Sequence, residues 1–178
     1  MSEAALADLI AKQAITEVLY RYCRGLDRMD REMALSCWHE GGTAHYLGMF
    51  QGTGVGFVDW VWEAHAEMER HSHQVTNPLI EVDGDHAVSE SYVTVGLWTR
   101  PAPQRFQITS RGRYLDRLSC RDGVWAIEHR VHIHDLTSRI ELPEDALEQV
   151  NSASRRDPKD PSFEILSSLR SDGASASD

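Results

Sequence analysis

The chain has 178 residues, which is enough for one domain with a sizeable hydrophobic core and too few for two ordinary domains. Its net charge of −10 excludes the basic surface that binds nucleic acid, and no apolar run approaches the roughly 20 residues that span a bilayer. The N-terminus carries acidic residues and no long apolar stretch, unlike a secretory signal. The sequence therefore predicts a cytoplasmic protein that binds neither nucleic acid nor a membrane.

The first half of the chain has the apolar spacing of helices. Residues 4–27 carry a ridge at four-residue intervals, made of Leu6, Ile10, Ala14, Val18, Tyr22 and Leu26. A short helix is predicted over residues 32–38, and a strand and turn follow it in "GGTAHYLGMFQG". A third helix is predicted over residues 55–70, with Phe57, Val58, Val61, Trp62 and Met68 facing inward.

After His73 the pattern changes to the alternation of β-strands. Asp83-Gly84 and Arg121-Asp122-Gly123 each separate two β-rich runs, so both predict hairpins. Helices followed by an antiparallel meander predict an α+β fold, with N-terminal helices packed on one face of a curved, mostly antiparallel sheet. This domain is expected to cover residues 1–142. The tail, residues 143–178, is expected to be partly helical and disordered at its end.

Two residues could form a catalytic pair. Asp27 ends an apolar helix, where it is either an exposed carboxylate or a side chain that points into a pocket. A negative charge is slightly unfavourable at the C-terminal end of a helix dipole, so a capping role explains Asp27 poorly. His73 begins a strand, where it is either an exposed junction residue or a general base whose far nitrogen an aspartate holds. His71 is expected to be still helical, which makes it the weaker candidate.

Tyr22 and Arg130 could stabilise an oxygen that gains negative charge. Tyr22 lies on the apolar ridge, so a core tyrosine is the alternative. In strict alternation, Arg130 shares its strand face with Glu128 and His132 rather than with the apolar side chains. A position in an apolar pocket therefore requires a β-bulge or an unusually polar inner face.

The sequence predicts neither a metal site nor a cofactor. His132 and His134 share a strand face, but no glutamate follows at the spacing of a cupin-like site. Cys23, Cys37 and Cys120 are odd in number and lack a CxxC pair, so reduced and mostly buried thiols are expected.

Three segments together carry a resemblance to a known family. "AITEVLYRYCRGLDRMD", "HSHQVTNPLIEVDGDHA" and "GRYLDRLSCRDGVWAIEHRVHIHD" resemble the first helix, the histidine-containing strand with its hairpin, and the last two strands of SnoaL-like proteins. These proteins form a branch of the nuclear-transport-factor-2-like, or cystatin-like, cone superfamily. The resemblance covers about residues 6–136 and implies a cystatin-like α+β cone or barrel.

The resemblance also implies an activity. The branch contains scytalone dehydratase, hexachlorocyclohexane dehydrochlorinase and bile-acid 7α-dehydratase, which perform cofactor-free eliminations with an Asp–His dyad. It assigns the dyad to Asp27 and His73 rather than to His71, and anion stabilisation to Tyr22 and Arg130. It further implies a homotrimer. Aromatic residues expected to bind a hydrophobic cyclic or aromatic substrate are Trp38, Phe57, Trp62, Tyr92 and Trp98.

The predicted function is therefore a cofactor-free lyase acting by dehydration or by a related carbon–carbon cleavage that releases an aldehyde. Three alternatives use the same fold. They are a non-catalytic β subunit of an aromatic-ring dioxygenase, a double-bond isomerase, and a ligand-binding domain.

Overall fold

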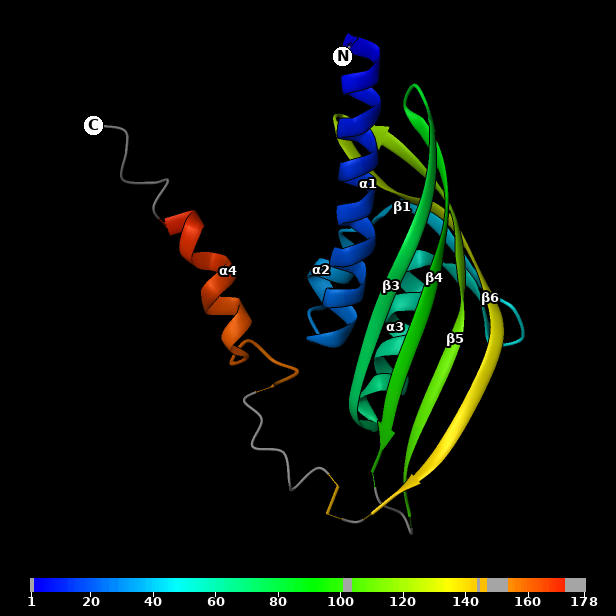
Figure 1. Ribbon diagram of the computed structural model, residues 1–178, viewed down its shortest axis with the longest axis vertical. Helices are drawn as coiled ribbons and strands as arrows, with labels where there is room; N and C mark the ends of the chain where they lie inside the picture. The colour runs from blue at the N-terminus through cyan, green and yellow to red at the C-terminus, as the bar shows by residue number, and fades with distance from the viewer. Residues whose placement is uncertain (1, 101–103, 144, 147–153, 172–178) are drawn as a thin grey trace.

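The computed structural model describes residues 2–100, 104–143, 145–146 and 154–171. One six-stranded sheet dominates it, in the order β2-β1-β6-β5-β4-β3 (Figure 1). Its strands are β1 (Trp38–Tyr46), β2 (Phe50–Thr53), β3 (Met68–Asp83), β4 (His86–Thr99), β5 (Arg105–Arg121) and β6 (Val124–Leu142). β1 and β6 pair in parallel and every other neighbouring pair is antiparallel, so the sheet is mixed and open rather than a closed barrel.

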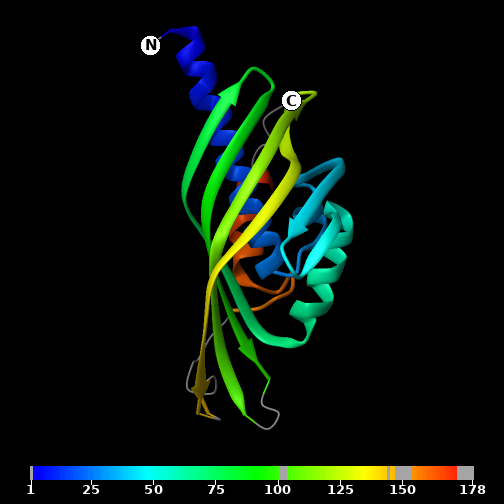
Figure 2. The same cartoon turned by 90° about the vertical axis from the view of Figure 1, so that its right-hand side faces the viewer.

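Two helices, α1 (Glu3–Asp27) and α3 (Gly54–Ala66), pack on the inner face of the curved sheet (Figure 2). The short helix α2 (Arg31–Leu35) packs against both of them. α1 packs along β3 and β6, and α3 packs on β1, β2 and β3. The buried core lies between these helices and the sheet. This arrangement confirms the predicted α+β cone with its N-terminal helices on a mostly antiparallel sheet.

Several predicted boundaries need correction. The second helix ends at Leu35, and Trp38 already begins β1. The third helix ends at Ala66, so His71 lies in strand β3 and not in a helix. The N-terminal half of the predicted ridge on α1 is exposed at Leu6 and Ile10, because the helix extends past the core there.

Both predicted hairpins are present. The β5–β6 loop is Asp122-Gly123, and both residues have positive φ (52° and 79°), as a two-residue type I′ turn requires. β3 and β4 pair up to Asp83 and His86. The turns thus set the register of the meander.

The described part of the tail contains one helix, α4 (Pro161–Ser171), as the sequence predicts around "SFEILSSL". The other predicted helical turns fall largely outside the described residues, and so does the end of the chain that was expected to be disordered. Among the described residues, no helix combines the length and apolar character needed to cross a membrane.

Candidate active site

Asp27 and His73 meet at the inner face of the sheet. Asp27 is the last residue of α1, and its Oδ1 accepts a hydrogen bond from His73 Nδ1 at 2.7 Å. Its Oδ2 accepts a second bond from the His73 backbone N–H at 2.9 Å. The side chains are 12% and 4% exposed. Because Nδ1 donates to the carboxylate, the neutral imidazole keeps its lone pair on Nε2, which is the arrangement of a general base.

His73 lines a partly open cavity of about 170 Å³ between α1, α3 and the sheet. Five aromatic side chains share this lining, namely Tyr22, Tyr46, Phe57, Trp60 and Tyr114. His65 and His132 add two imidazoles. The cavity is therefore an aromatic chamber with His73 at its wall.

The phenols in this chamber are neutral hydrogen-bond donors. Tyr22 is fully buried, and its hydroxyl lies 3.3 Å from that of Tyr46. Burial, with the nearby Tyr46 and Tyr114, raises the pKa of Tyr22 well above its usual value. Burial likewise raises the pKa of Tyr46 and of Tyr114. Such hydroxyls can donate to a developing oxyanion without ionising first.

Arg130 lies beyond two of these tyrosines and has no exposed surface. Its guanidinium donates to both carboxylate oxygens of Asp116 at 2.7 Å each. Its Cζ lies 4.5 Å from the Tyr22 ring centre and 3.9 Å from that of Tyr114. Burial lowers the pKa of Arg130, but the charge and hydrogen bonds of Asp116 more than offset this and leave the pKa raised. The buried arginine is therefore a permanent cation.

A β-bulge places Arg130 inside. On β5, Arg117 and Leu118 are adjacent, yet their partners on β6 are His129 and Ile127. Glu128 is thus an additional residue that breaks the alternation, so Ile127 and Arg130 are both buried. Arg130 does not belong to the described lining of the cavity. Its guanidinium instead contacts the rings of Tyr22 and Tyr114, which do line the cavity.

His71 has a structural role. Its Nε2 donates to the carbonyl of Leu26 at 2.9 Å, and its Nδ1 accepts from Arg156 at 3.2 Å. Burial, partly countered by the Leu26 bond, lowers the pKa of His71 to about 4. With both nitrogens engaged and the ring neutral, His71 has no free atom for proton transfer.

Of the five predicted substrate-binding aromatics, only Phe57 belongs to the described lining of the cavity. Trp38 is buried near Arg130, and Trp62 packs partly buried against the core while Trp60 takes the position on the lining. Tyr92 is 49% exposed, and Trp98 lines a different hollow. The inward residues of β4 are odd-numbered, including Val95 and Leu97, so the prediction placed both aromatics on the wrong face.

The sequence reasoning missed several residues of the lining, namely Tyr46, Trp60, His65, Tyr114 and His132. The alternation of strands gives a usable signal for two of them. Tyr46 is two residues after the buried Ala44, and Tyr114 is two residues before the buried Asp116. His132 could not be predicted without the bulge at Glu128, because the bulge determines that residue 132 faces the core. His134 is exposed and contacts Thr137.

The described residues contain no group of three or more His, Cys, Asp or Glu side chains that could hold a metal ion. His132 and His134 share a strand face in regular register, but His132 is buried and His134 is exposed.

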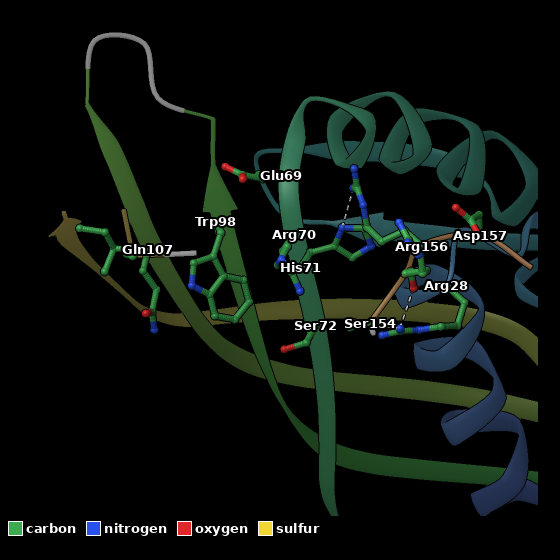
Figure 3. A pocket seen from close by; sticks show the side chains of 13 residues that line it. Arg28, Glu69, Arg70, His71, Ser72, Trp98, Gln107, Ser154, Arg156 and Asp157 are labelled. Carbon is green, nitrogen blue, oxygen red and sulfur yellow. Dashed lines mark hydrogen bonds between the residues drawn. The ribbon is translucent and has the colours of Figure 1, made fainter. Parts of the chain in front are cut away.

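A larger hollow of about 900 Å³ lies elsewhere, between β3 and the C-terminal segment (Figure 3). Arg28, Arg70, Arg155 and Arg156 line it, together with His71 and Trp98. Neither Asp27 nor His73 belongs to its described lining. Both members of the dyad line a third hollow of about 570 Å³ beside α1, and His73 also lines the aromatic chamber of about 170 Å³. We place the chemistry in the chamber, because its lining includes the tyrosine hydroxyls that can donate to a developing oxyanion.

Comparison with known proteins agrees with this fold. A structure of a protein of unknown function from Mycobacterium tuberculosis is 28% identical, with a TM-score of 0.65, and covers 96% of this chain and 95% of its own. A putative scytalone dehydratase from Novosphingobium aromaticivorans is 23% identical, with a TM-score of 0.66, over 76% of this chain and 91% of its own. The LinA-type3 hexachlorocyclohexane dehydrochlorinase from Novosphingobium barchaimii is 18% identical, with a TM-score of 0.66, over 74% and 91%.

No curated protein matches the chain significantly. The model of the SnoaL-like domain matches residues 7–131, which contain most of α1, His73 in β3 and all of the sheet up to the middle of β6. The chain is therefore a member of the SnoaL-like domain family.

Proposed function

We propose that this protein is a cofactor-independent lyase in which His73 removes a proton from a small cyclic or aromatic substrate. The observation that carries the proposal is the 2.7 Å bond from His73 Nδ1 to Asp27, with the ring at the wall of an aromatic cavity. Asp27 fixes the tautomer and stabilises the imidazolium that forms. General-base catalysis contributes about 10²–10⁴-fold, so positioning and anion stabilisation supply the rest.

Loss of water is the leading reaction. Nε2 of His73 takes a proton from carbon, the electron pair of that bond forms a carbon–carbon double bond, and hydroxide departs from the neighbouring carbon. The departing oxygen gains negative charge beside Tyr22 and Tyr46, whose hydroxyls donate to it. The buried cation of Arg130 favours that charge from behind the Tyr22 ring. The proton on His73 completes the water.

The volume of the cavity limits the substrate. An apolar cavity of about 150 Å³ holds one benzene molecule. The chamber of about 170 Å³ is therefore suited to hold one ring with one or two small substituents beside His73, and further rings of a larger substrate would extend out through its open side. The volume thus favours hydroxylated monocyclic compounds.

We also propose a cytoplasmic homotrimer. Exposed apolar side chains on the sheet, including Tyr92, Leu136 and Ile140, support an association of copies. Sedimentation velocity tests it: one species of three times the chain mass of 20.1 kDa is expected, and a monomer at all concentrations contradicts it.

The reaction is tested by incubating the metal-free protein with hydroxylated monocyclic and polycyclic compounds, followed by mass spectrometry. A mass loss of about 18 indicates dehydration and a loss of about 30 indicates formaldehyde release. The variants His73→Ala and Asp27→Asn should each lower turnover by about 10²-fold or more with the fold intact. Activity near wild type in both variants overturns the mechanism, while tight binding without any product indicates a ligand-binding domain.

A further inference from the structure

The C-terminal segment reaches back to the start of β3 through Arg156 (Figure 3). The Arg156 guanidinium donates to the carbonyl of His65 at 2.7 Å and to the carbonyl of Met68 at 2.9 Å. It also donates to Nδ1 of His71 at 3.2 Å. One side chain of the tail therefore joins the end of α3 to the beginning of β3.

The contact continues through His71 to the end of α1. Since Arg156 occupies Nδ1 of His71, the proton of the neutral ring resides on Nε2, which donates to the Leu26 carbonyl. The His71 ring is also stacked on His65, with centroids 4.1 Å apart. Leu26 directly precedes Asp27. Through His71 the tail thus adds a second hydrogen bond to the Leu26 carbonyl, which also accepts the backbone N–H of Met29 at 3.1 Å.

A second contact holds the residue on the other side of Asp27. Arg28 donates to Oδ2 of Asp160 at 2.9 Å and to the carbonyl of Arg155 at 2.7 Å. The same Oδ2 accepts the backbone N–H of Arg155, and Oδ1 accepts the N–H of Ser162. Asp160 is buried, and its carboxylate organises the turn that leads into α4. The tail and the residue that caps α1 therefore share one partly buried ion pair.

We propose that Arg156 and Asp160 are positioning residues for the Asp27–His73 dyad. Asp160 contacts Arg28 directly and Arg156 reaches Leu26 through His71, and Leu26 and Arg28 are the two neighbours of Asp27. A carboxylate at a helix terminus would otherwise move as the last turn frays. A misplacement of about 1 Å can lower turnover about 10²-fold, so this anchoring sets the Asp27–His73 geometry. The inference rests on the proposed function of the dyad.

The part after Leu142 is a fifth of the chain, so the alignment with the Mycobacterium tuberculosis structure, which covers 96% of the chain, includes most of the tail. The alignments with the putative scytalone dehydratase and the LinA-type3 dehydrochlorinase cover 76% and 74% of the chain.

The test uses the full-length chain and two readouts. The first is the downfield ¹H NMR signal of the His73 Nδ1 proton bonded to Asp27, assigned by its loss in His73→Gln. The second is turnover on whichever compound of the panel reacts. Arg156→Ala should broaden or remove the signal and lower kcat about 10–100-fold, with KM changed less than about threefold. Arg156→Lys should restore part of both, because an ammonium can reach the same carbonyls.

Asp160→Asn probes the other contact and should weaken the signal in the same way. Lys159→Ala is the matched control, since it removes one exposed cation of the same segment and should change neither readout. An unchanged signal and unchanged kcat in both Arg156→Ala and Asp160→Asn overturn the inference. An intact signal in wild type with full activity in His73→Ala instead overturns the proposed function, so the two failures are distinguishable.

Discussion

Two side-chain pairs, each joining a carboxylate to a nitrogen base, lie near Tyr22. The Asp27–His73 pair joins α1 to β3, and the Asp116–Arg130 pair joins neighbouring strands β5 and β6. Both carboxylates accept two hydrogen bonds from one partner residue. The pairs differ in access: His73 lines the cavity, whereas Arg130 and Asp116 are enclosed by protein.

This difference separates two uses of one interaction. A histidine beside a carboxylate can gain and lose a proton near neutral pH, and it needs a free nitrogen at the cavity. An arginine beside a carboxylate cannot exchange its proton, so burial turns it into a fixed charge. The Asp27–His73 pair is therefore suited to proton transfer. The Asp116–Arg130 pair is suited to holding the rings of Tyr22 and Tyr114 in place and to setting a positive charge beside them.

The largest expected effect comes from breaking the enclosed pair. Asp116→Ala leaves the Arg130 cation buried without its partner and should lower the free energy of unfolding by about 3–5 kcal/mol. Urea denaturation followed by circular dichroism measures it. Asp27→Asn should cost less than about 1 kcal/mol in the same assay, because an amide retains part of the hydrogen bonding there.

The double variant Asp116→Leu/Arg130→Met provides the control, since it removes both charges and fills similar volume. It should recover more than half of the lost stability. A loss below about 1 kcal/mol in Asp116→Ala contradicts the assignment of this pair as a fixed, structurally required charge.

Tyr22 is where the two pairs meet, because it lines the cavity with His73 and stacks on Arg130. Tyr22→Phe keeps the ring and removes the hydroxyl. If that hydroxyl donates to the departing oxygen, kcat should fall about 10²–10³-fold, which is the usual effect of removing one such donor. Steady-state kinetics measures it, with Tyr20→Phe, an exposed tyrosine on the same helix, as control. A change below about threefold would assign the donor role elsewhere.

The smallest effect concerns pH. Burial, His134 and Arg130 lower the pKa of His132 to about 4, and burial first among several causes lowers that of His71 to about 4. Between about pH 6.5 and 4 the unfolded chain therefore binds more protons than the folded chain, so stability falls as the pH falls. Each of these histidines should contribute a loss of about 1 kcal/mol between pH 7 and 5.5.

Urea midpoints at the two pH values test this sign. His132→Gln should lose less stability on acidification than wild type, while His134→Gln, at an exposed position of the same strand, should match wild type. Equal losses in all three proteins would show that His132 titrates normally in the folded state.

The sequence was informative where local chemistry decides structure. Period and turn residues predicted α1, the two hairpins and the sheet, and the motif resemblance singled out Asp27 and His73, which the structure brings together. It was less informative where tertiary pairing decides. The face on which Tyr92 and Trp98 lie depends on strand parity set from a distant partner, and the link from Arg156 to His71 spans 85 positions. Such contacts leave no local pattern to read.

The additional residue at Glu128 shifts the phase of β6 by half a period. Before Glu128, the odd-numbered residue Ile127 faces the core. After it, even-numbered residues face the core, so the guanidinium of Arg130 and the imidazole of His132 are buried. Deleting that single residue would restore regular pleating and turn both groups toward solvent without altering either one. In this fold the polar groups around the chamber thus depend on the number of residues in β6 as well as on which residues they are.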